Sequence, residues 1–118
     1  MDKKLYDSEW RLMELVWEDE PVTARELSLT AAARLGWNKN TTYTVLKKLV
    51  EKEAIRRAEP GFLCTSLVGR EEARRAETDS LIRKLYGGSR KALFSSLVQD
   101  ERLSDEELLE LRRLLDQR

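Results

Sequence analysis

The stretch WNKNTTYTVLKKLV at residues 37–50 decides the fold. Asn38 is a typical helix N-cap residue. The apolar residues after it recur three and four positions apart, at Val45, Leu46, Leu49 and Val50. The segment 41–45 is rich in β-forming residues and could be taken for a strand. The cap before it and the spacing after it agree on a helix, so we predict one from Asn38 to about Lys52.

Two further helices are predicted before this one. The first covers about Ser8–Glu18, after a cap at Asp7-Ser8, because apolar residues there recur at helical spacing. These residues are Trp10, Met13, Val16 and Trp17. The second begins at the capping box Thr23-Ala24-Arg25-Glu26 and stops at Gly36.

A β-hairpin is predicted after the third helix. Residues 54–57 and 62–67 alternate apolar and polar side chains on either side of the turn Glu59-Pro60-Gly61. Three helices followed by a two-stranded hairpin form a winged helix-turn-helix, which we assign to residues 1–68. Its third helix is the one that would enter a DNA groove.

The remaining residues, 69–118, form a separate helical region, so the fold class is mainly α. Helices are predicted at about Arg70–Tyr86, from a Ser89 cap to Gln99, and from the capping box at Ser104-Asp105-Glu106-Glu107 onward. From Leu81 on, this region holds 14 large apolar residues in 38 positions. Three short helices cannot enclose so many apolar side chains by themselves.

We therefore expect a second copy of the chain to cover this region, making it a dimerisation module. The alternative is that it folds back on its own N-terminal domain. The predicted dimer contacts are the large apolar residues Leu81, Leu85, Leu93, Phe94, Leu97, Val98, Leu108, Leu111 and Leu115.

Composition argues against catalysis. The chain has no histidine, which is the commonest general base and metal ligand, and it lacks a phosphate-cradling glycine loop. The single cysteine, Cys64, lies in a predicted strand with no neighbouring base. We predict no enzyme activity, no catalytic residue, no metal and no cofactor. No apolar run is long enough to span a membrane, so we expect a cytoplasmic protein without membrane insertion.

Charge is distributed unevenly although the net charge is zero. Residues 1–33 hold 4 basic and 8 acidic side chains, whereas residues 34–57 hold 7 basic and 2 acidic ones. A concentrated basic segment can bind phosphates even on a neutral protein. A solvated helix face would explain the charge alone, but its position on the third helix and the hairpin favours DNA.

The residues predicted to contact DNA form two sets. Base edges would be read by the polar start of the third helix: Asn38, Lys39, Asn40, Thr41, Thr42 and Thr44. Phosphates would be bound by Tyr43, Lys47, Lys48, Arg56 and Arg57. Tyr43 could instead pack beneath the helix, and Asn38 could serve only as a cap.

Several motifs in order resemble the penicillinase-repressor family, the BlaI/MecI/CopY group of bacterial regulators. They are Ser8-Glu9-Trp10 with Met13 and Trp17, Pro21-Val22-Thr23-Ala24-Arg25-Glu26, Trp37 with residues 41–49, Leu67-Val68, Gly87-Gly88 and residues 103–108. The resemblance implies a homodimeric transcriptional repressor that binds a palindromic double-stranded DNA operator. Genes controlled in that family are typically those of β-lactam resistance or of copper handling.

In the β-lactam branch the resemblance also implies a membrane sensor protease, or a protease downstream of it, as a partner. The matching cleavage would lie near Ser96-Leu97, where this chain lacks the family's Asn-Phe pair. The C-terminal cysteine cluster of the copper branch is absent from this sequence, so copper sensing is not expected. Alternatives are a winged-helix protein-interaction adaptor and a regulator with a different inducer. The operator sequence, the genes and the inducing signal do not follow from the sequence.

One departure concerns the end of the third helix. The family commonly has Lys-Gly there, and this chain has Lys52-Glu53. If position 53 keeps a positive φ, a glutamate costs about 1 kcal/mol relative to glycine.

Overall fold

A computed structural model describes residues 4–118, which divide into two compact units. The first unit, called the head below, ends at Ala76, and the second, called the tail, covers Glu77–Arg118. The division falls inside helix α4 (Arg70–Tyr86), which contributes to both units. The assignment of function to residues 1–68 and 69–118 stays a prediction.

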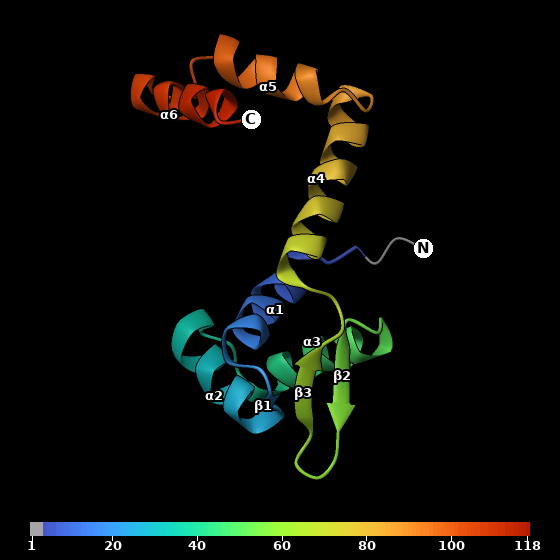
Figure 1. Ribbon diagram of the computed structural model, residues 1–118. Coiled ribbons are helices and arrows are strands. Elements are labelled where there is room, and N and C mark those ends of the chain that lie inside the picture. Colours follow the sequence, from blue (N-terminus) through green and yellow to red (C-terminus); the bar gives the residue numbers. More distant parts are fainter. Residues whose placement is uncertain (1–3) are drawn as a thin grey trace. The chain divides into compact units, whose positions relative to one another are not determined.

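The head contains the three predicted helices: α1 (Asp7–Asp19), α2 (Ala24–Leu35) and α3 (Lys39–Glu51) (Figure 1). Asn38 caps α3 as predicted, and its Oδ1 accepts a hydrogen bond from the Thr41 N–H at 2.8 Å. Gly36 ends α2 at a φ of 70°, a conformation that glycine adopts without strain. A short connection therefore joins α2 to the cap of α3.

The caps of α1 and α2 differ in detail from the prediction. The N-cap of α1 is Tyr6 rather than Asp7 or Ser8, because the Tyr6 N–H donates to the Glu9 carboxylate at 2.8 Å. At α2 the Glu26 N–H donates to the Thr23 hydroxyl, as a capping box requires. The Thr23 hydroxyl in turn donates to the Glu26 carboxylate, so the carboxylate does not complete the box at the backbone.

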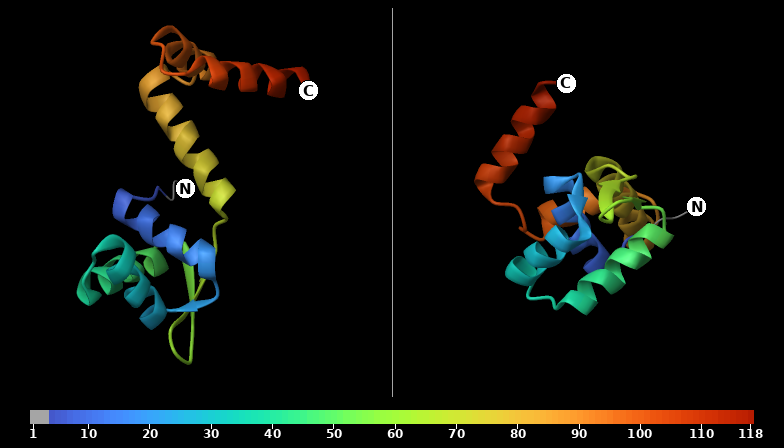
Figure 2. Two further views of the ribbon diagram at one scale, coloured as in Figure 1. Left: turned by 90° about the vertical axis from the view of Figure 1, so that its left-hand side faces the viewer. Right: turned by 90° about the horizontal axis from the view of Figure 1, so that it is seen from below.

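The hairpin is present and belongs to a sheet of three strands in the order β1-β3-β2. β2 (Ile55–Ala58) pairs antiparallel with β3 (Leu63–Ser66), and Arg57 lies opposite Cys64. A strand that the sequence did not predict, β1 (Val22–Thr23), pairs with the other edge of β3. The loop between β2 and β3 extends beyond the helices of the head (Figure 1 and the left view of Figure 2).

A single apolar core holds the head together. Fully buried side chains come from α1, α2, α3, β2 and β3, among them Leu12, Leu27, Leu46, Ile55 and Cys64. Trp10, Trp17 and Trp37 pack partly buried against this core. The Trp17 Nε1–H also donates to the carbonyl oxygen of Val68 at 2.9 Å, which ties the end of the sheet to α1.

The tail has the predicted helices with the predicted ends. After α4 come α5 (Arg90–Gln99), capped by the Ser89 hydroxyl, and α6 (Asp105–Asp116), opened by the Ser104–Glu107 capping box. Neither α5 nor α6 has a buried side chain. Within residues 77–118, all of which the structure describes, Ile82 alone is buried.

Candidate nucleic-acid interface

The first turns of α3 present a row of polar side chains. Lys39, Asn40, Thr41 and Thr44 are exposed, as base-reading residues must be. Asn38 is exposed too, but its side-chain oxygen is engaged by the Thr41 N–H. A two-bond contact of Asn38 with adenine would have to share this oxygen with the cap, so Asn38 serves first as the cap.

Thr42 is a correction to the predicted base-reading set. Its side chain is fully buried, at 0% exposure, and its hydroxyl donates to the Asn38 carbonyl oxygen at 3.3 Å. Because no surface of Thr42 reaches solvent, it cannot contact a base. It packs on the core face of α3 together with Val45, Leu46 and Leu49.

Tyr43 connects α3 to the hairpin. Its ring is partly buried and lies edge-on to the ring of Phe62, with centroids 6.3 Å apart. The backbone oxygen of Phe62 also accepts a hydrogen bond from the Ala24 N–H at the start of α2. Phe62 thereby joins the hairpin to both helices of the helix-turn-helix. Of the two predicted roles of Tyr43, packing is the one that this geometry supports.

The cations predicted to bind phosphate are exposed, and they differ in their partners. Lys47, Lys48 and Arg56 are exposed. The Arg57 guanidinium lies 3.8 Å from the centroid of the Phe62 ring and pairs with Glu59 at 2.7 Å. The hydrogen bond from Arg57 lowers the pKa of the Glu59 carboxyl. Arg57 would therefore have to exchange Glu59 for a phosphate, whereas Arg56 would not.

A charged cluster at the other end of α3 was missed by the sequence reading. Glu9, on α1, is buried and its Oε1 accepts a hydrogen bond from the Lys52 ammonium at 2.6 Å. The same ammonium donates to the Lys4 carbonyl oxygen and lies 4.4 Å from the Tyr6 ring centroid. The available signal was the position of Glu9, three and four residues before the core residues Leu12 and Met13.

Glu53 follows this cluster with a φ of 62°, so position 53 keeps the positive φ considered above. Cys64 is buried in β3, and burial raises the pKa of its thiol to about 11. A thiol with that pKa is protonated near neutrality and is a poor nucleophile.

The residues predicted to form a dimer contact are partly or largely exposed within the tail. Leu81, Leu85, Phe94, Val98 and Leu115 are exposed, and Leu93, Leu97, Leu108 and Leu111 are half-buried. Ser96 and Leu97, at the predicted cleavage, lie inside α5. The Ser96 hydroxyl forms a hydrogen bond of 2.9 Å with the Tyr86 hydroxyl. Among the helices of residues 4–118, none has the length and apolar character of a membrane-spanning segment.

A family model and two curated relatives indicate the same family. The family model described as "Penicillinase repressor" matches residues 5–117. The "Penicillinase repressor" of Staphylococcus aureus is 27% identical over 111 residues, covering 92% of this chain and 88% of the relative. "Methicillin resistance regulatory protein MecI" of Mammaliicoccus sciuri is 28% identical over the whole length of both chains.

Solved structures confirm the fold. The DNA-binding domain of the repressor BlaI matches with a TM-score of 0.56 and 20% identity, covering 61% of this chain and 90% of that domain. MarR of Staphylococcus aureus matches with a TM-score of 0.53 and 20% identity, covering 96% of this chain and 70% of its own. The predicted winged-helix fold is therefore confirmed.

Proposed function

Because this chain belongs to the penicillinase repressor family, we propose that it is a sequence-specific DNA-binding transcriptional repressor of the β-lactam-resistance type. Two of the relatives that it matches carry the names of a repressor and a regulatory protein. The observation that carries the proposal is the row of exposed polar residues opening α3, followed on α3 and β2 by the exposed cations Lys47, Lys48 and Arg56. A recognition helix needs this order, with bases at its N-terminal turns and phosphates beside it.

Within this proposal the residues of α3 and β2 divide into three groups. Lys39, Asn40, Thr41 and Thr44 read base edges, with the lysine suited to guanine and the asparagine to adenine. Lys47, Lys48, Arg56 and Arg57 bind phosphates and set affinity. Thr42 and Tyr43 hold the helix to the core and to the hairpin, so they act on DNA binding only through position.

The repressor acts as a homodimer on a palindromic operator. Two observations support a second copy: α5 and α6 bury no side chain of their own, and Leu85 and Leu115 are more than 60% exposed. A symmetric dimer presents two identical copies of α3, which match half-sites one or two helical turns apart. One helix alone contacts too few base pairs to specify an operator.

Fluorescence anisotropy with DNA from upstream of the chain's own gene tests the proposal. Thr44→Ala should relax discrimination at one base pair by about 1–3 kcal/mol and leave binding to random DNA unchanged. Arg56→Ala should weaken binding to all sequences and lower the slope of log affinity against log salt by about one. If no complex forms at low salt, the adaptor alternative replaces the repressor.

The proposed protease partner would act on α5, between Ser96 and Leu97. Both residues are half-buried and helical, so cleavage requires α5 to open locally. Co-expression with a membrane sensor metalloprotease, in the presence of a β-lactam, should then yield two fragments and release the operator. If the operator is released while the chain stays intact, the repressor has a different inducer.

A further inference from the structure

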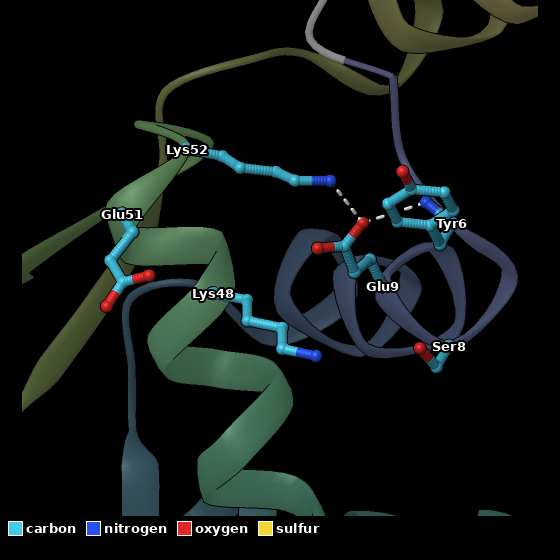
Figure 3. Close-up of a pocket in the computed structure, with 6 residues that line it drawn as sticks. All are labelled: Tyr6, Ser8, Glu9, Lys48, Glu51 and Lys52. Carbon is cyan, nitrogen blue, oxygen red and sulfur yellow. Dashed lines mark hydrogen bonds and ion pairs between the residues drawn. The ribbon is translucent and has the colours of Figure 1, made fainter.

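A pocket of about 450 Å³ lies between the start of α1 and the last turns of α3 (Figure 3). Its lining consists of Tyr6, Ser8, Glu9, Lys48, Glu51 and Lys52. This volume falls in the range of small-molecule sites, which is about 300–1,000 Å³. The proposed contacts with operator bases lie at the opposite end of α3, so base reading does not account for the pocket; of its lining, Lys48 alone is also assigned to operator phosphates.

The Glu9 carboxylate is only half satisfied by the residues that the structure describes. Its Oε1 accepts hydrogen bonds from the Tyr6 N–H and from the Lys52 ammonium. Its Oε2 is buried and has no hydrogen-bond partner among residues 4–118. Buried polar atoms in native proteins nearly always have a partner. An unpaired carboxylate oxygen beside a pocket therefore indicates a hydrogen-bond donor that lies outside residues 4–118.

The cation on the other side of the pocket is Lys48. Its side chain extends from α3 toward α1, while that of Glu51 points away from Glu9 (Figure 3). Lys52 is already engaged by Glu9, by the Lys4 carbonyl oxygen and by the Tyr6 ring. Lys48, which is exposed, forms no ion pair with the residues that the structure describes. The pocket thus offers one unpaired acceptor and one uncommitted cation.

We propose that this pocket is a binding site for a small zwitterion of the α-amino-acid type. The ammonium group of the ligand donates to Glu9 Oε2, and its carboxylate accepts from the Lys48 ammonium, with the Ser8 hydroxyl beside it. A single water molecule could satisfy Oε2, but it would engage only one of the two charged groups of the pocket. A ligand with both charges complements both protein groups at once.

Occupation of the pocket would act on DNA binding through Lys48, a point that rests on the proposed function. Lys48 is among the cations assigned to operator phosphates, and its ammonium cannot serve a ligand carboxylate and a phosphate fully at the same time. The ligand should therefore weaken operator binding, and the slope of log affinity against log salt should fall by about one.

Binding is tested first without DNA, on the full chain. The probes are the free protein-forming α-amino acids, added in turn while backbone amide signals are followed by heteronuclear NMR. At least one amino acid should shift the amides of Ser8, Glu9 and Lys48. Its deaminated and decarboxylated analogues should each bind at least about tenfold more weakly. The proposal is overturned if no amino acid shifts these amides, or if the carboxylate-only analogue binds equally well.

Two variants on neighbouring lysines make the test specific. Lys48→Gln should lower the affinity for the amino acid by at least about tenfold. Lys47→Gln is the same change one residue earlier, outside the pocket lining, and should leave this affinity unchanged. Equal effects would show only general charge attraction and would contradict the site. Glu9→Gln should also abolish binding, but its loss of the Lys52 ion pair threatens folding, so the decision rests on the exposed lysines.

Operator binding is then measured with and without the amino acid. If the amino acid binds and operator affinity falls, the site and its regulatory role both stand. If the amino acid binds and the operator affinity is the same with and without it, the regulatory role is wrong while the site stands. If no operator is bound under any condition, the proposed function fails, and the pocket is judged by the NMR titration alone.

Discussion

The head buries its apolar side chains, whereas the tail leaves most of its own exposed or half-exposed. In the head, α1, α2, α3 and the sheet share one core, and side chains such as Leu12, Leu46 and Leu49 are completely buried. In the tail, leucines at helical spacing stay in contact with solvent, and Ile82 alone is buried within Glu77–Arg118. Extensive contacts between elements all fall in the head. The head therefore has a core of its own, whereas in the proposed dimer a second copy would cover the apolar side chains that the tail leaves exposed.

The largest expected effect tests the tail. Phe94→Asp places a charge where a half-exposed ring would be covered by the second copy. Burying a phenylalanine side chain is worth about 1.5–3 kcal/mol, and a symmetric dimer loses it twice, so the dimer dissociation constant should rise at least about 100-fold. Sedimentation velocity over a concentration series measures this shift.

Lys91→Asp is the matched control, since Lys91 is an exposed charged residue on the same helix. It should leave the dissociation constant within about threefold of that of the parent protein. A parent protein that stays monomeric at every concentration would contradict the comparison, because the tail would then tolerate its exposed apolar side chains unaided.

The next effect tests the head. Leu46→Ala removes a completely buried side chain and should lower the free energy of unfolding by about 2–5 kcal/mol. Denaturant titration at several protein concentrations should give the same loss each time, because the core is supplied by one chain. Leu114→Ala, at a position 54% exposed in the tail, is the control. It should change the stability of the head by less than about 0.5 kcal/mol. A loss for Leu46→Ala that varies with concentration would mean that the head depends on the dimer.

Two threonines on α3 sharpen the comparison within the head. Thr42→Val removes the buried hydroxyl that donates to the Asn38 carbonyl oxygen and should lower the free energy of unfolding by about 1 kcal/mol. Thr41→Val changes an exposed side chain and should alter stability by less than about 0.5 kcal/mol. In operator titrations the order reverses: base preference should change for Thr41→Val and not for Thr42→Val. The same change of preference in both variants would contradict the burial of Thr42.

The features that the sequence predicted correctly are local ones. The ends of α5 and α6 follow from Ser89 and Ser104, whose hydroxyls bond to backbone N–H groups three residues on. A cap of this kind is decided within one turn of helix, so the sequence alone contains it. The third helix followed in the same way from Asn38 and the apolar spacing after it.

The features that it missed depend on distant partners or on a polar residue in an apolar position. β1 is two residues long and exists through its pairing with β3, some forty residues away. The Glu9–Lys52 ion pair joins residues 43 positions apart. Thr42 lies three residues before Val45 and four before Leu46, which is the spacing of a buried position, but its polarity led to the prediction that it is exposed and reads a base.

The smallest expected effect uses a strained residue in each unit. Glu53 in the head and Glu101 in the tail both have a positive φ, at 62° and 55°. Glycine adopts this conformation freely, so Glu53→Gly should raise the free energy of unfolding of the head by about 1 kcal/mol at every protein concentration. Glu101→Gly should give a gain of similar size that appears in the tail, and therefore in the temperature at which the dimer melts.

Glu51→Gly is the control for Glu53→Gly, because Glu51 is the last helical residue of α3. Glycine at position 51 should lower the free energy of unfolding of the head by up to about 1 kcal/mol. This change has the opposite sign to the one expected for Glu53→Gly, two residues away. Thermal melts at several concentrations separate the two units. If the gain from Glu101→Gly were independent of concentration, as expected for Glu53→Gly, the tail would hold its structure without a partner.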